Sequence, residues 1–178
     1  QVLATSVWFA PNAVMAALQP RWPVAGGEGL VTTAVQLGFI AGTLAFAVLG
    51  LADRFHPSRV FRVSALMAAA ANLAVVTFPD RFVAVLAARF VVGFSLAGVY
   101  PVGMKIAAGW YAGGLGRALG LLVGALVLGT ASPHLISALG ADLAWSWVLV
   151  VSSLAAAAGG VLVGRVPEGP HLRRGGPV

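Results

Sequence analysis

The sequence has 178 residues, of which 60% are hydrophobic and 9% charged, and its mean hydropathy is +0.95. A soluble domain carries about 25% charged residues, so 11 basic and five acidic side chains leave too little polar surface for a soluble protein of this size. The net charge of +6 does not indicate a nucleic-acid binder, because the basic residues lie between long apolar segments. The absence of cysteine excludes disulfides, thiol catalysis and cysteine-based metal sites in this chain.

Six apolar segments are long enough, the shortest only just, to cross a hydrocarbon core of about 30 Å as helices. We expect an all-α, polytopic membrane protein whose six spans form a bundle over residues 1–164. The spans are expected at about 1–18, 30–52, 63–78, 82–104, 118–139 and 143–164. The first is interrupted by Pro11 and Asn12, and its start inside an apolar run favours a chain that begins within its first helix over a cleaved signal peptide.

Basic residues are distributed unevenly between the connecting segments. The loops after the second and fourth spans and the tail at 165–178 hold eight, namely Arg54, Arg59, Arg62, Lys105, Arg117, Arg165, Arg173 and Arg174. The other loops hold two, Arg21 and Arg81, beside Glu28, Asp80 and Asp142. The positive-inside rule then places both termini in the cytoplasm, in the cell (inner) membrane, with the tail as a cytoplasmic linker. An aromatic belt is expected from Trp22, Trp145 and Trp147 outside and from Trp110 and Tyr111 inside.

The loop after the second span reads Gly50-Leu51-Ala52-Asp53-Arg54-Phe55-His56-Pro57-Ser58-Arg59 and resembles the signature loop of the major facilitator superfamily. The resemblance implies that the glycine lets the end of the helix approach a neighbouring helix. It also implies that Asp53 accepts charge-assisted hydrogen bonds and favours a helix N-terminus, in a network that holds one conformation and breaks in the other. The implied switch loop comprises Gly50, Asp53, Arg54 and Arg59, the last placed later than in the family. The alternative is an ordinary positive-inside loop.

The fourth span contains Arg89, the only charge within the six expected spans. Placing an Arg in a membrane helix costs about 2.5–3.5 kcal/mol on insertion scales, so such a residue suggests a function. Arg89 followed by Gly93 resembles a second motif of the same superfamily, which implies proton coupling or binding of an anionic substrate group. The alternative is a structural Arg that donates to backbone carbonyls and to an Asn or Gln.

Polar residues of several spans lie at a similar depth, about 8–10 Å below the outer surface. In the family that this chain resembles, the first, second, fourth and fifth spans line the cavity. The residues expected at the substrate or at proton coupling are Arg89, Asn12, Gln36, Trp8, Tyr100 and His134. Asn72 has a similar depth in the third span, which is peripheral in that fold, so each polar residue could equally make an interhelical hydrogen bond. His134, after Pro133, could also be a packing or capping residue.

Glycines recur within the spans at a spacing of four. Close helix packing is expected at Gly38, Gly42, Gly93, Gly120, Gly124 and Gly129. The second and fifth spans would correspond if the six helices form two inverted three-helix repeats. Pro101 and Pro133 are each expected to bend their helices.

The resemblance implies a secondary active transporter for a small solute, with an anion permitted by Arg89, that works by alternating access as a symporter or antiporter. This chain would be its N-terminal half, with a proton as coupling ion and the C-terminal six-helix half missing. Tyr100–Lys105 and Arg117–His134 resemble the nitrate/nitrite and cyanate carriers. No cofactor or metal is expected. The alternative is a complete six-helix scaffold or subunit, whereas an intramembrane enzyme lacks a catalytic constellation.

Overall fold

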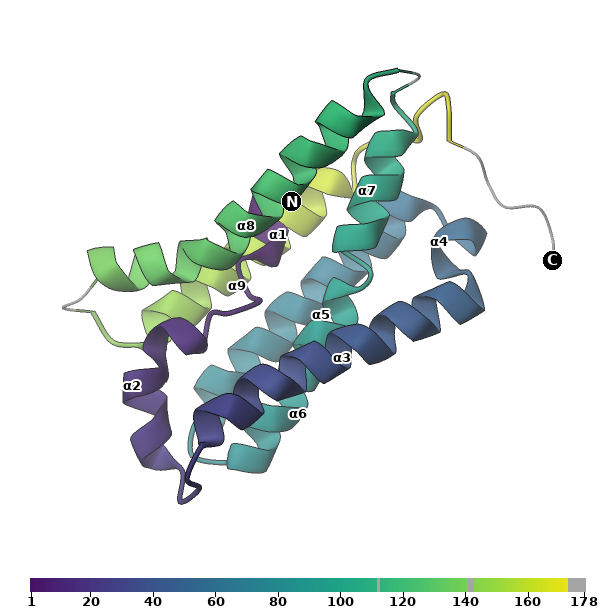
Figure 1. The fold of residues 1–178 in the computed structure, drawn as a ribbon. Helices are drawn as coiled ribbons and strands as arrows, with labels where there is room; N and C mark the ends of the chain where they lie inside the picture. The colour runs from purple at the N-terminus through teal and green to yellow at the C-terminus, as the bar shows by residue number, and fades with distance from the viewer. Residues whose placement is uncertain (112, 141–142, 173–178) are drawn as a thin grey trace.

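The computed structural model describes residues 1–111, 113–140 and 143–172, and in these residues the regular structure is entirely helical (Figure 1). The long helices are α3 (Gly27–Leu49), α5 (Pro57–Thr77), α6 (Phe82–Leu96), α7 (Tyr100–Ala108), α8 (Leu115–Leu139) and α9 (Ser146–Val163). Counting Phe82–Ala108 as one, five helices of the described chain are long and apolar enough to cross a membrane. The all-α expectation is confirmed, and Asp142, Arg173 and Arg174 lie outside the described residues.

The first expected span is not one helix. It consists of α1 (Val2–Thr5), η1 (Asn12–Val14), α2 (Met15–Leu18) and an irregular stretch at 6–11, and η2 (Gln19–Arg21) follows it. Proline has no N–H and its ring conflicts with the carbonyl four residues earlier, so Pro11 prevents a continuous helix. The interruption that we predicted is present, but it extends back to Ser6, and a sixth long helix is not confirmed.

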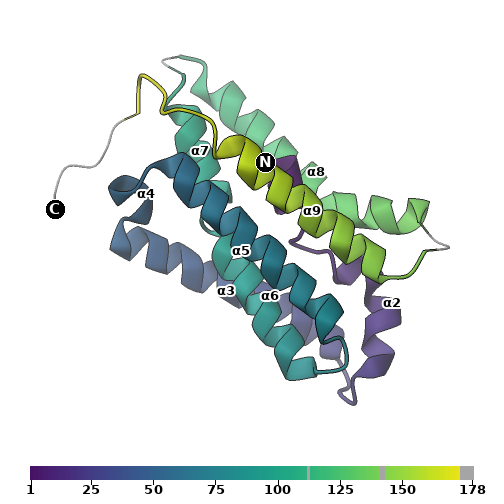
Figure 2. The ribbon, with the colours of Figure 1, turned by 180° about the vertical axis from the view of Figure 1, so that it is seen from behind.

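The long helices pack in sequence-distant pairs. The two views in Figures 1 and 2 show α3 beside α6, and α5 between α6 and α9, while the short α1 packs against α8 and α9. Small side chains lie between α5 and α9, where Ala65, Ala68 and Ala69 face Ala156 within one buried cluster. Because lipid is as apolar as the core, close van der Waals packing between small residues is a main source of association energy for such helices.

Glycines set the separation of α3 and α6. A Cβ on Gly38 would lie 2.8 Å from the carbonyl carbon of Phe90, and one on Gly93 would lie 2.8 Å from the Phe39 nitrogen. A Cβ on Gly42 would also meet the α6 backbone. Real side chains do not approach backbone atoms so closely, so each position requires glycine for the two helices to touch.

The glycines of α8 divide into two kinds. Gly129 packs against α1, where a Cβ would lie 2.5 Å from the Val2 carbonyl oxygen. Gly120 and Gly124 do not act as expected within this chain, because a Cβ on either would meet nothing within 4 Å. Their side of α8 faces away from the other described helices, so close packing there requires a surface beyond them.

Two prolines bend the spans as expected. The fourth span is divided at residues 97–99, and Pro101 lies in the first turn of α7. Helix α8 bends visibly (Figure 1) and contains Pro133, which leaves the Gly129 carbonyl without its helical donor. The Ser132 hydroxyl donates to that carbonyl instead, at 2.7 Å.

The loops after the first and third spans meet the start of α9 at one end of the bundle. Arg21 forms an ion pair with Asp80 at 2.9 Å and lies 5.5 Å from the centre of the Trp145 ring. The Trp22 indole N–H donates to the Pro79 carbonyl at 2.8 Å. Trp22 is only 5% exposed, so it is a buried connection between loops and not part of the aromatic belt in which we placed it.

Candidate functional site

Arg89 lies in α6 with no solvent exposure. Its Nη1–H group donates to the Val7 carbonyl at 3.1 Å and to Asn72 Oδ1 at 3.3 Å, and Nη2–H donates to the Trp8 carbonyl. Among the described residues, Nε has no partner. The guanidinium is therefore held by two backbone carbonyls of the broken first span and by one amide. This is the geometry of the structural alternative for Arg89.

Asn72 connects this arginine to two further helices. It is fully buried in α5, and its Nδ2–H₂ group donates to Ser153 Oγ at 3.0 Å and to the Leu149 carbonyl at 3.2 Å, both in α9. The buried amide thus satisfies donors and acceptors from α6 and α9 at once. Sequence reasoning noted Asn72 only for its depth. The sequence signal that could have identified this role is that Asn72 lies on the same face of α5 as several small residues.

Of the other residues expected at a substrate site, Trp8 contacts Arg89 through its backbone carbonyl, and the side chains do not gather around the guanidinium. Asn12 donates from Nδ2 to Thr32 Oγ1 at 2.7 Å, which joins the first span to α3. The Trp8 ring packs on Phe39, with ring centres 4.8 Å apart.

Three further residues were expected at the same site. Gln36 of α3 and His134 of α8 are exposed, and Tyr100 is half-buried at the first residue of α7. The predicted polar layer is therefore a set of separate contacts in this conformation.

The predicted switch loop is largely helical and not an open loop, with a short helix in its first half and Arg59 in the first turn of α5. Gly50 ends α3 with a left-handed backbone, φ +59°, and α4 (Leu51–Arg54) follows at once. A Cβ on Gly50 would meet nothing within 4 Å. Close approach to a neighbouring helix, which the resemblance implied, is therefore not the reason for glycine here. The positive φ is the reason, because other residues rarely adopt it.

Asp53 of α4 forms an ion pair with Lys105 of α7. Lys105 Nζ also donates to the Ala52 carbonyl at 2.7 Å, which fixes the lysine over the end of α4. The side chains of Asp53 and Lys105 are 51% and 22% exposed, and Arg54 and Arg59 are exposed beside them. Lys105 was missed as the partner of Asp53, although it is the basic residue nearest the inner end of the fourth span.

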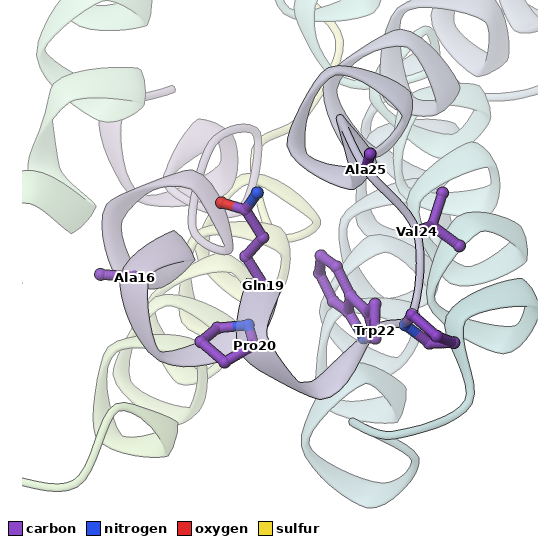
Figure 3. A pocket seen from close by; sticks show the side chains of 7 residues that line it. Ala16, Gln19, Pro20, Trp22, Val24 and Ala25 are labelled. Atoms are coloured by element: carbon purple, nitrogen blue, oxygen red, sulfur yellow. The ribbon is translucent and has the colours of Figure 1, made fainter.

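Of two hollows of similar volume, one borders the ion pair of Asp53 and Lys105. One of about 420 Å³ is lined by Asp53 and Lys105 with Thr43, Phe46 and Pro101 among others, so the ion pair borders a cavity between α3 and the fourth span. Another, of about 450 Å³, lies beside Gln19 and Trp22 in the turn before α3 (Figure 3). None of the expected substrate residues lines this second hollow.

The comparison with known protein families agrees with the sequence motifs, with the long apolar helices and with the ion pair between Asp53 and Lys105. Comparisons with curated proteins and with solved structures give no match. The family model of the Major Facilitator Superfamily matches residues 2–177, nearly the whole chain. This favours a transporter over a scaffold or an intramembrane enzyme. The chain belongs to the major facilitator superfamily, whose members are multi-pass membrane proteins that transport small solutes.

Proposed function

We propose that this chain forms one six-span bundle of a secondary active transporter that works by alternating access, with a second bundle facing it across the substrate path. The observation that carries the proposal is the ion pair between Asp53 and Lys105, which joins the inner ends of the second and fourth spans beside a cavity. A contact at that place can hold one conformation and be broken in the other. We place this end of the bundle and both termini in the cytoplasm, because the loops rich in Arg and Lys lie at this end.

The broken segment at residues 1–22 supplies the sixth crossing in this proposal. Gln1 packs against Gly103 of α7, toward the end that holds Lys105. Trp22 contacts Pro79 and the Phe82 ring at the opposite end. The segment therefore runs along the bundle from one end toward the other, which supports a sixth span with an internal break.

The faces of α3 and α8 support the second bundle. Only 22% of the most apolar stretch of α3 and 11% of that of α8 is buried, against 39–50% for the other long helices. On α8 the uncovered surface includes Gly116, Gly120 and Gly124, which have open space around them. Small residues at this spacing suit a closely packed helix better than lipid chains.

A small solute is the substrate, and the geometry gives an anion no particular support because the Arg89 guanidinium is occupied by protein groups. A proton is the coupling ion that we propose. Of the three histidines in the sequence, His134 is the one within a span, which makes it the residue to test for proton coupling. His134→Gln should remove the pH dependence of uptake, and unchanged pH dependence would exclude this residue.

The test is uptake by the full-length protein in proteoliposomes. Asp53→Asn and Lys105→Met should each slow turnover by up to about fivefold, because a partly exposed ion pair contributes about 0.2–1 kcal/mol. The double variant should be no slower than either single one. Asp80→Asn, which breaks the ion pair with Arg21 at the other end, is the matched control. Wild-type turnover in both switch-loop variants would contradict the proposal.

A further inference from the structure

Pro11 leaves a carbonyl of the first span without a partner. In an α-helix the carbonyl of residue 7 accepts from the N–H of residue 11, and here residue 11 is a proline without an N–H. No backbone N–H of the described chain donates to the Val7 carbonyl in its place. Within a hydrocarbon core no water can replace the missing donor, so another protein group has to do so.

Arg89 supplies that donor from α6. Its Nη1–H group reaches the Val7 carbonyl and its Nη2–H group reaches the adjacent Trp8 carbonyl. A guanidinium presents its donors in a rigid planar fork, so one side chain can satisfy two neighbouring carbonyls. The arginine is completely buried, which leaves its position determined by these contacts and by Asn72.

Asn72 gives the arrangement a rigid base. Its amide oxygen accepts from Arg89, and its amide N–H groups are held by Ser153 and Leu149 of α9. The break in the first span is thereby tied through α6 to α5 and α9. A different solution operates at Pro133, where the neighbouring Ser132 hydroxyl satisfies the freed carbonyl of Gly129. That bend needs no other span.

We propose that Arg89 is a positioning residue that replaces the N–H missing at Pro11 and holds the break at residues 6–11, and that it binds neither substrate nor proton. The inference rests on the proposed transport function in one respect. The break that Arg89 holds lies in a span that moves during the transport cycle. Loss of Arg89 should loosen this segment before it affects any other part of the bundle.

The first test measures the exposure of the break. A single cysteine at Phe9, which is half-buried within the break, is introduced into an otherwise cysteine-free full-length protein. Its reaction with a water-soluble maleimide should become faster in Arg89→Ala, on the order of tenfold, because a lost buried hydrogen bond has that weight. Guanidinium ion should reverse the increase, and Arg89→Lys should be intermediate. Arg81→Ala, at an exposed position at the start of α6, is the matched control.

The second test uses the proline. Pro11→Ala restores an N–H for the Val7 carbonyl, so the effect of Arg89→Ala should shrink severalfold in the Pro11→Ala background. Pro133→Ala, the matched control, should give no such relief. If Arg89→Ala alone does not accumulate in the membrane, membrane level replaces the labelling rate. Recovery in the Pro11→Ala background then supports the inference, and no recovery overturns it.

An unchanged labelling rate in Arg89→Ala, with altered substrate KM or pH profile, would overturn the inference and make Arg89 a binding residue. An equal effect of Arg89→Ala with and without Pro11 would overturn it as well. Labelling requires no transport. Loss of the proposed function would therefore appear as absent uptake by the wild-type protein, while the labelling results still decide the role of Arg89.

Discussion

The contact between α3 and α6 depends on Gly93 to a degree that can be estimated. In Gly93→Ala the new Cβ would lie 2.8 Å from the Phe39 nitrogen and 2.8 Å from the Val35 carbonyl carbon. The Val35 carbonyl oxygen would lie closer still. Non-bonded heavy atoms prefer about 3.5–4.0 Å, so α3 has to move by more than about 1 Å. All three neighbours are backbone atoms, which cannot rotate away as a side chain can.

Two opposing terms decide the size of the effect. Overpacking of this kind costs about 1–3 kcal/mol, whereas alanine gains about 0.5–1 kcal/mol over glycine within a helix. The rigid backbone contact places Gly93→Ala in the upper part of the first range. We expect a net destabilisation of about 1–2 kcal/mol.

Thermal unfolding of the purified full-length protein in detergent measures this change. Gly93→Ala should lower the unfolding midpoint by several degrees. Gly29→Ala is the matched control on α3, because a Cβ there meets nothing within 4 Å, and it should leave the midpoint unchanged or raise it. A midpoint for Gly93→Ala that equals that of Gly29→Ala would show that the two helices do not touch at this glycine.

Three further substitutions test separate parts of the structure. Asn72→Leu should destabilise the protein by about 1–3 kcal/mol, measured as above, because buried donors lose their acceptor; an unchanged midpoint would contradict the network. Ser132→Ala should cost only about 0.6 kcal/mol, a typical value for a hydrogen bond within a membrane, and a larger loss would mean that Gly129 has no alternative donor. Gly124→Phe should reduce uptake at normal membrane level if its face packs on the second bundle that we propose, whereas Leu154→Phe, 62% exposed on α9, should not; equal uptake would place lipid at Gly124.

The positions of the long helices were largely predictable from apolarity, and the early start of α5 shows what apolarity misses. Helix α6 begins at Phe82 and α8 ends at Leu139, as expected. Helix α5 begins at Pro57, six residues before the expected span, and its first turns carry Arg59 and Arg62. Apolarity marks where a helix enters lipid, not where its hydrogen bonds begin, so charged turns beyond the membrane were missed.

The site was less predictable because its main acceptors are backbone atoms. The fully buried Arg89 was identified from its charge, but the carbonyls of Val7 and Trp8 carry no signature in their own side chains. Pro11 was the indirect signal, since it determines which carbonyl lacks a donor. The pairing of Asp53 with Lys105 depends on how the second and fourth spans pack, which the sequence alone does not specify.

The unequal lengths of the spans bear on the choice of membrane. Helix α9 has 18 residues and rises about 27 Å, whereas the 25 residues of α8 rise about 37 Å. A longer helix adapts to a hydrocarbon core of about 30 Å by tilting or bending, and α8 has its bend at Pro133. A helix that is shorter than the hydrocarbon core either thins the bilayer around it or leaves its ends below the membrane surface. Bilayer thickness therefore acts first on α9 and, through Leu149 and Ser153, on the helix that holds Asn72.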